Sequence, residues 1–286
     1  MKKVCVVAAA LAIVLSLCPA ASEAGTFLVG AKYWYTNWDS GVLDWFQKDI
    51  SAGFKAVGVN LQSDVDRGKG WLAGPVLGYQ TDDGSWNFSM AIMAFSDFTQ
   101  DWTGSAGTMN LATNIDTTRR DYDFAIAYSL ARHKNVFAPF EYFRVFFGYK
   151  YQTVDYDLVL TYNTTMGVRT YRYNLDAKVH MPTVGIGFTY PIFEKLVFGA
   201  QAGAGIALID LTMTDPDGKE FDIDPKYSFA FNTEANLTFT PYRNFIMQLG
   251  FRYQEWYLEA RSPQRWDKTE SRDTTFGPTA TIVYTF

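Results

Sequence analysis

The chain has 286 residues, of which 48% are apolar and 17% are aromatic, whereas only 19% are charged. This composition is too apolar for a disordered chain, and a formal charge of −5 lacks the basic excess that nucleic-acid binding requires. Two His and two Cys leave too few ligands for a multi-residue metal centre.

The N-terminal segment has the pattern of a secretory signal peptide. A start with two lysines is followed by an almost wholly apolar run, and a small-x-small motif occupies residues 22–24. We therefore predict a signal peptide over 1–24 and a single mature domain over 25–286. Both cysteines, Cys5 and Cys18, belong to the predicted signal peptide, so the mature chain is expected to contain no thiol.

Beyond this segment, apolar residues alternate with small or polar ones at a period of two. Phe245, Leu249 and Phe251 fall on one face of such a segment, and Gln248 and Arg252 fall on the other. Segments of roughly ten residues with this alternation are typical of strands in a transmembrane barrel. The pattern predicts ten strands, over 26–38, 70–80, 86–98, 120–131, 136–152, 176–191, 196–212, 226–240, 245–259 and 273–286.

The connections between these segments alternate between short and long. The predicted short turns are 81–85, 132–135, 193–195 and 241–244, and the predicted long polar connections are 39–69, 99–119, 153–175, 213–225 and 260–272. Short periplasmic turns and long outer loops are the arrangement of outer-membrane barrels, and an even number of strands places both chain ends in the periplasm.

The alternation, the aromatic-rich apolar face and the last strand, which ends on Phe286, together resemble Gram-negative outer-membrane β-barrels. The resemblance covers the mature chain and implies an all-β, antiparallel transmembrane barrel in the bacterial outer membrane. It also implies contact with membrane lipid and lipopolysaccharide. Ile282, Tyr284 and Phe286 would form the terminal signal that the barrel-assembly machinery reads. No single family is indicated, and the oligomeric state is left open.

The first long connection leaves alternatives open. Residues 53–61 are also strand-like, and a further strand within 39–50 would make a barrel of twelve strands. We favour ten strands, with 53–61 as part of a structured first loop or as an extension above the membrane. Leu43, Phe46 and Ile50 have helical spacing, which is consistent with a plug in the barrel mouth, a helix at the lipid interface or an ordinary loop.

Extending the alternation inward predicts a set of charges on the lumen wall. They are Lys32, Asp123, Arg144, Glu234 and Arg252. Antiparallel register about the short turns places Asp123 near Arg144, and Glu234 near Arg252. Each pair either satisfies charges inside a narrow barrel or forms a constriction that selects ions and small solutes. Many glycines share the inward face, and a lumen of small residues favours a narrow pore.

Two weaker motifs contain residues that could carry chemistry. Residues 215–224 concentrate carboxylates but lack the spacing of a calcium loop, so no metal site is predicted. His133 falls in a predicted short turn and His180 in a strand, without an evident Ser or acidic partner. We therefore predict no catalytic residues, no cofactor and no enzymatic activity.

The sequence thus predicts an outer-membrane barrel that forms a narrow porin-like channel for small polar solutes or ions. The lumen charges would set its selectivity, and the first loop would control access. The alternative is a closed structural or adhesin-like barrel that acts through its outer loops.

Overall fold

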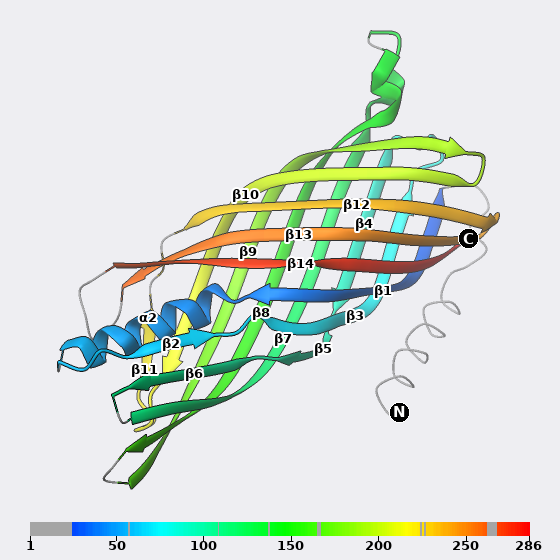
Figure 1. Ribbon diagram of the computed structural model, residues 1–286. Helices are drawn as coiled ribbons and strands as arrows, with labels where there is room; N and C mark the ends of the chain where they lie inside the picture. Colours follow the sequence, from blue (N-terminus) through cyan, green and yellow to red (C-terminus); the bar gives the residue numbers. More distant parts are fainter. Residues whose placement is uncertain are drawn as a thin grey trace.

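The computed structural model describes residues 25–56, 58–107, 109–136, 138–164, 167–223, 225, 227–261 and 268–286, so the predicted signal peptide lies outside the described residues. The described chain forms one antiparallel sheet that is rolled into a barrel (Figure 1). Its strands are β1 (Thr26–Asp39), β2 (Gln62–Val65), β3 (Gly68–Gln80), β4 (Trp86–Met93), β5 (Phe95–Thr99), β6 (Asp101–Ala106), β7 (Met109–Ser129), β8 (Phe143–Thr164), β9 (Gly167–Phe193), β10 (Leu196–Thr214), β11 (Glu220–Ile223), β12 (Ser228–Tyr242), β13 (Phe245–Arg261) and β14 (Lys268–Thr285). The helices are α2 (Gly41–Ala56), η1 (Leu130–His133) and η2 (Ala138–Tyr142).

The sheet closes on itself because β1 pairs with β14 on one side and with β3 on the other. The ring then runs through β4, β7, β8, β9, β10, β12 and β13. Strands β4, β5 and β6 together fill one position of the ring, between β3 and β7. Strand β3 pairs with β4 and β5, and β7 pairs with β4 and β6. The prediction of a ten-stranded barrel is confirmed. The twelve-stranded alternative is wrong, because most of the segment that it required forms α2.

An apolar belt surrounds the barrel next to the end that carries the short turns. Gly25 and Phe286, the first and last described residues, also lie at this end. The side chains of the belt point outward and are exposed: Tyr33, Phe88, Phe124, Phe147, Ile186, Ile206, Phe229, Leu237, Leu249, Phe251 and Ile282. Such a belt is the surface that a barrel presents to lipid. None of the helices in the described part of the chain is long and apolar enough to cross a membrane.

The strands continue well beyond this belt, and there the alternation inverts. Strand β8 has 22 residues, about twice the 9–11 that a membrane crossing needs. In its outer half Val154 and Leu158 point inward and are buried, whereas Asp155 and Asp157 point outward. The predicted loops 99–119 and 153–175 are therefore mostly strand. They escaped prediction because above the membrane the polar face is the outer one.

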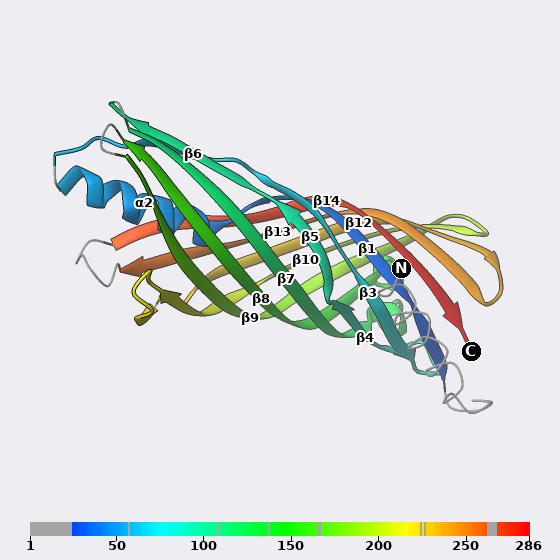
Figure 2. The ribbon, with the colours of Figure 1, turned by 90° about the horizontal axis from the view of Figure 1, so that it is seen from below.

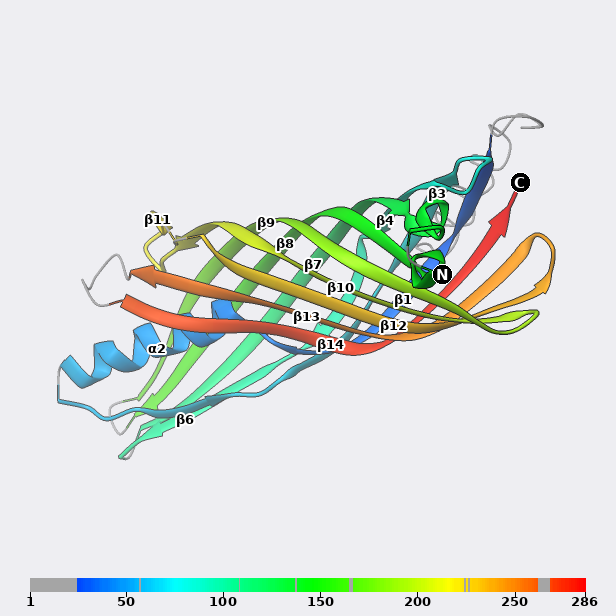
Figure 3. The same cartoon turned by 90° about the horizontal axis from the view of Figure 1, so that it is seen from above.

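Helix α2 lies inside this outer half of the barrel, at the end away from the C-terminus in all three views (Figures 1, 2 and 3). Its residues Val42, Leu43, Trp45 and Phe46 are buried in the core cluster. The Phe46 ring contacts Trp102 of β6 at 5.8 Å and Tyr173 of β9 at 5.2 Å between ring centroids. Of the alternatives for this segment, the structure shows the plug.

The connection between β7 and β8 is longer than predicted. Residues 130–142 contain η1 and η2, so β8 begins at Phe143 instead of 136. The register of β7 and β8 consequently shifts by six residues: Asp123 is opposite Lys150, and Arg144 is opposite Ser129. The predicted proximity of Asp123 and Arg144 is wrong for this reason.

Candidate functional site: the barrel lumen

Charged side chains inside the membrane part of the barrel form pairs across the lumen. Lys32 of β1 contacts Glu234 of β12 at 3.1 Å, and Arg252 of β13 contacts Asp123 of β7 at 2.6 Å. Lys150 of β8 lies 3.5 Å from Asp123. The Lys150–Asp123 pair joins the neighbouring strands β7 and β8. The other two pairs join strands that are not neighbours in the ring, so they tie separate parts of the barrel wall together.

A second charged layer lies directly above the first and is fully buried. The Arg119 guanidinium donates to both carboxylate oxygens of Asp121, at 3.0 and 3.1 Å. It also donates to Thr275 at 2.8 Å and to Gln152 at 3.3 Å. Lys150 reaches Asp121 at 2.5 Å, so it joins the two layers.

Two tryptophans of β1 are packed among these cations. The Trp34 ring has the guanidinium carbon of Arg252 at 4.9 Å and the ammonium nitrogen of Lys150 at 5.5 Å from its centroid. The Trp38 ring has the guanidinium carbon of Arg119 at 4.8 Å. Desolvated cations over indole rings are attracted by about 2 kcal/mol at such distances, so the rings hold the charged layers in place as well as filling space.

The lumen is filled at the level of these layers. Each position of the ring supplies one inward residue here that is at most 2% exposed: Trp34, Leu72, Met93, Asp121, Gln152, Val179, Ala207, Ala230, Gln254 and Thr275. A water-filled passage would leave exposed area on the side chains that face it. The barrel is therefore closed at this height.

The base of the plug is attached to the top of the charged layers. The Asp273 carboxylate of β14 accepts from the Trp38 indole at 2.9 Å and from the Gly41 backbone N–H at 3.2 Å. Ser40 caps the helix by accepting from the Leu43 N–H at 3.2 Å. A carboxylate and a hydroxyl at the first turn of α2 satisfy helix N–H groups that have no partner inside the helix.

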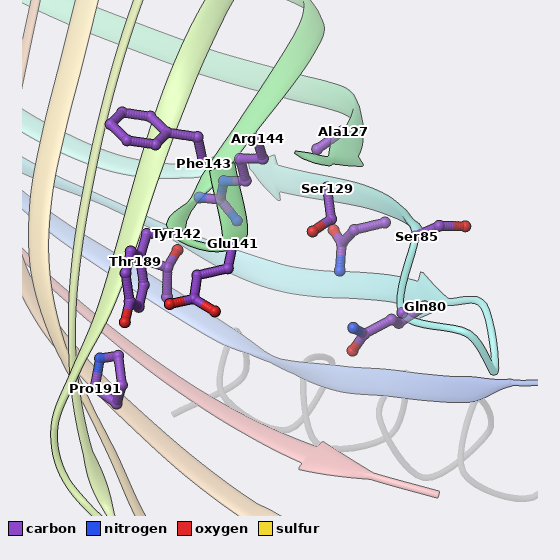
Figure 4. A pocket seen from close by; sticks show the side chains of 12 residues that line it. Gln80, Ser85, Ala127, Ser129, Glu141, Tyr142, Phe143, Arg144, Thr189 and Pro191 are labelled. Atoms are coloured by element: carbon purple, nitrogen blue, oxygen red, sulfur yellow. The ribbon is translucent and has the colours of Figure 1, made fainter. Parts of the chain in front are cut away.

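Below the charged layers the barrel is hollow. A space of about 650 Å³ lies at the periplasmic end, and a smaller one of about 190 Å³ lies beneath Arg252 and Glu234. Figure 4 shows Arg144 in the larger space, with Tyr142, Thr189 and Pro191 to one side and Gln80 to the other. We call this larger space the vestibule.

The sequence-predicted lumen charges all point inward, but the pairing differs from the prediction. Glu234 and Arg252 are directly opposite each other on neighbouring strands, as the register argument requires. Each nevertheless forms its ion pair with a strand that is not its neighbour, Glu234 with Lys32 of β1 and Arg252 with Asp123 of β7. Arg144 stands apart, and among the described residues it donates only to Gln201, at 3.2 Å.

Several functional residues were missed from the sequence. Arg119, Asp121 and Lys150 carry the second layer, and Asp273 holds the plug. A signal existed for Lys150, which shares the inward alternation of Arg144. No such signal existed for Arg119, because the strand was expected to begin after it.

The comparisons with known proteins support the fold. No protein-family model and no curated protein matches this sequence. Among solved structures, the outer membrane protease OmpT from Escherichia coli is similar, with a TM-score of 0.51 and 11% identity over 92% of this chain and 96% of that one. The chain has the fold of an outer-membrane β-barrel.

Two other solved structures are similar at lower scores. The translocator domain of the autotransporter NalP from Neisseria meningitidis has a TM-score of 0.45 and 8% identity, with 99% of this chain and 93% of that chain covered. The attachment invasion locus protein Ail of Yersinia pestis has a TM-score of 0.34 and 12% identity, with 93% and 100% covered.

The two histidines of this outer-membrane barrel lie away from the lumen. His180 is on the outer wall, where its Nδ1 is 2.6 Å from the Tyr149 hydroxyl and its ring stacks on Tyr151. His133 is in η1 at the periplasmic end, beside Tyr128.

The carboxylates of residues 215–224 shape a turn. Asp215 accepts from the backbone N–H groups of Asp217 and Lys219. The described residues contain no group of three or more potential metal ligands.

Proposed function

We propose that this protein is a closed barrel that acts through its extracellular part as a surface-interaction protein, without enzymatic activity. The observation that carries the proposal is the filled level of the lumen. There the charges are paired, and buried ion pairs of this kind hold their geometry because breaking one costs 3–5 kcal/mol. A solute crossing this level would have to separate the pairs and displace α2.

The outer wall above the membrane supports a role at the surface. Strands β7 to β10 carry five outward carboxylates, which we call the acidic wall: Asp116, Asp155, Asp157, Asp176 and Asp210. Three of them are ion-paired on the same wall, Asp155 with Arg120, Asp157 with Arg172 and Asp176 with Lys178, so the wall has only a small excess of negative charge. Two pairs of these carboxylates are directly opposed, Asp116 with Asp157 and Asp155 with Asp176. Like charges in that position destabilise a sheet. Their gathering on one side favours a partner with a basic surface, or lipopolysaccharide bridged by divalent cations.

Conductance in planar lipid bilayers tests the closed state. Refolded protein of residues 25–286 should give no discrete current steps at any salt concentration, while its heat-modifiable migration on gels shows that it is folded. Steps that appear in folded wild-type protein, and change ion selectivity in Arg252→Gln, would establish a channel instead.

The acidic wall has its own test with probes of opposite charge. The folded protein in detergent should bind immobilised polylysine but not heparin, and added salt should weaken the binding. A variant with Asp155, Asp157 and Asp176 changed to Asn should lose this binding. Equal binding by the variant would remove the wall from the proposal.

A channel is the second candidate, because the hollow vestibule and the cavity above it fill the periplasmic half of the lumen with solvent space. In that case small polar solutes or ions would pass only when α2 and the charged layers rearrange. Deletion of α2 would then raise the conductance.

A further inference from the structure

The vestibule contains a cation that no carboxylate of the described residues contacts directly. Lys32, Arg119, Lys150 and Arg252 each contact a carboxylate. Arg144 contacts none among the described residues, and its Nε is buried without a hydrogen-bond partner. A buried donor without a partner is costly, and a guanidinium offers five donors in a fixed planar fork.

The neighbouring strands hold this guanidinium in one position. Arg144 of β8, Gly187 of β9 and Gln201 of β10 form a row across the sheet, paired directly in register. A Cβ on Gly187 would lie 2.5 Å from the Arg144 Nε, so the side chain lies across the glycine. It reaches Gln201, whose amide oxygen accepts at 3.2 Å. The cation is therefore placed by the fold, with most of its donors free.

The surrounding space suits a small ligand. At about 650 Å³ the vestibule has the size of a small-molecule site, and its wall offers the polar side chains of Gln80, Asn87, Ser129 and Thr189. The barrel wall separates it from lipid, and the filled level above closes it. A ligand must therefore be water-soluble and must enter from the periplasm.

We propose that the vestibule binds a small soluble oxyanion, a phosphate or carboxylate group, through the Arg144 fork. A bidentate contact would use the terminal N–H groups, because the Nε is buried against Gly187. Glu141 also lines the vestibule, and its negative charge opposes the anion. The site is independent of the role proposed for the surface, because both an open and a closed barrel leave the vestibule accessible from the periplasm.

Inorganic phosphate is the probe. The readout is the set of arginine Nε–H resonances in NMR spectra of the folded, ¹⁵N-arginine-labelled protein in detergent micelles. Arg144→Lys identifies the Arg144 resonance by its loss and keeps the positive charge, so the barrel should still fold. That resonance should move saturably with phosphate at constant ionic strength, and chloride should not move it. Arg132, a periplasmic arginine paired with Asp83, is the matched control and should not saturate.

Two variants test the geometry. Glu141→Gln should tighten binding by about threefold, the scale of one exposed charge interaction. Gly187→Ala should abolish the saturable shift by displacing the guanidinium, while the protein still folds. The proposal is overturned if the Arg144 resonance does not move with phosphate, or if Arg144 and Arg132 shift alike without saturation. Failure here leaves the conductance and polylysine results unaffected.

Discussion

Removal of one carboxylate from the second charged layer is expected to destabilise the barrel severely. Asp121 is 0% exposed and neutralises both Arg119 and Lys150 at 2.5–3.1 Å. With an effective dielectric constant near 20, each contact represents roughly 5 kcal/mol of attraction, most of which offsets the desolvation of the ions. Asp121→Asn leaves Arg119 buried without a carboxylate contact and Lys150 with Asp123 alone, so the free energy of unfolding should fall by about 3–5 kcal/mol.

The assay is urea unfolding of the refolded protein in lipid vesicles, followed by tryptophan fluorescence. The matched control is Asp157→Asn, which removes a bidentate partner of Arg172 from the exposed outer wall and should cost about 1 kcal/mol or less. A combined change of Arg119 to Met and Asp121 to Leu should recover much of the loss, because it removes the unpaired guanidinium and Lys150 keeps its contact with Asp123. Equal, small losses for Asp121→Asn and Asp157→Asn would refute the buried network.

Three further outcomes follow from the outer half of the barrel and from one close approach in the sheet. Burial and the neighbouring Asp176 carboxylate raise the pKa of Asp155, so Asp176→Asn should stabilise the fold at pH 7 by about 0.2–1 kcal/mol, with no gain in acid where both carboxyls are protonated. Burial raises the pKa of Asp273 from 3.8 to about 6, so its ionisation should lower stability by up to about 3 kcal/mol as the pH rises from 4 to 6. Unfolding midpoints of Asp273→Asn across that range should lack this decline, and an unchanged pH profile would contradict it. A Cβ at Gly74 would lie 1.7 Å from a backbone carbonyl oxygen of β4, so Gly74→Ala should lower the free energy of unfolding by about 1–3 kcal/mol. Gly78→Ala, whose Cβ would have contacts of 3.2 Å or more, should be tolerated. Equal stabilities of the two variants would argue against this packing.

Much of the fold was predictable because the membrane imposes a simple rule on the residues in contact with it. Lipid selects apolar side chains on the outward face, so segments such as 245–259 reveal both their extent and their orientation. The rule ends at the membrane surface. In β8 the apolar side chains Val154 and Leu158 point inward. A pattern search for apolar residues on the outward face therefore predicts a loop for this part of the strand.

The lumen was predictable in composition but not in pairing. The alternation brought Lys32, Glu234 and Arg252 to the inward face, where the structure has them. Which of them meet depends on contacts across the barrel, and a pattern along one strand carries no such information. The position of Arg144 depended on the length of one connection, and a six-residue error there changed its partner from a carboxylate to the Gln201 amide.

Accessibility of single cysteines along the lumen tests the closed level most directly. The described chain has no cysteine, so Ser129→Cys in the vestibule and Thr36→Cys at the filled level, where Thr36 is 0% exposed, give two clean probes. In the folded protein a water-soluble maleimide should modify Ser129→Cys rapidly and Thr36→Cys only after unfolding. Rapid modification of both would show that water passes the charged layers, and the barrel would not be closed.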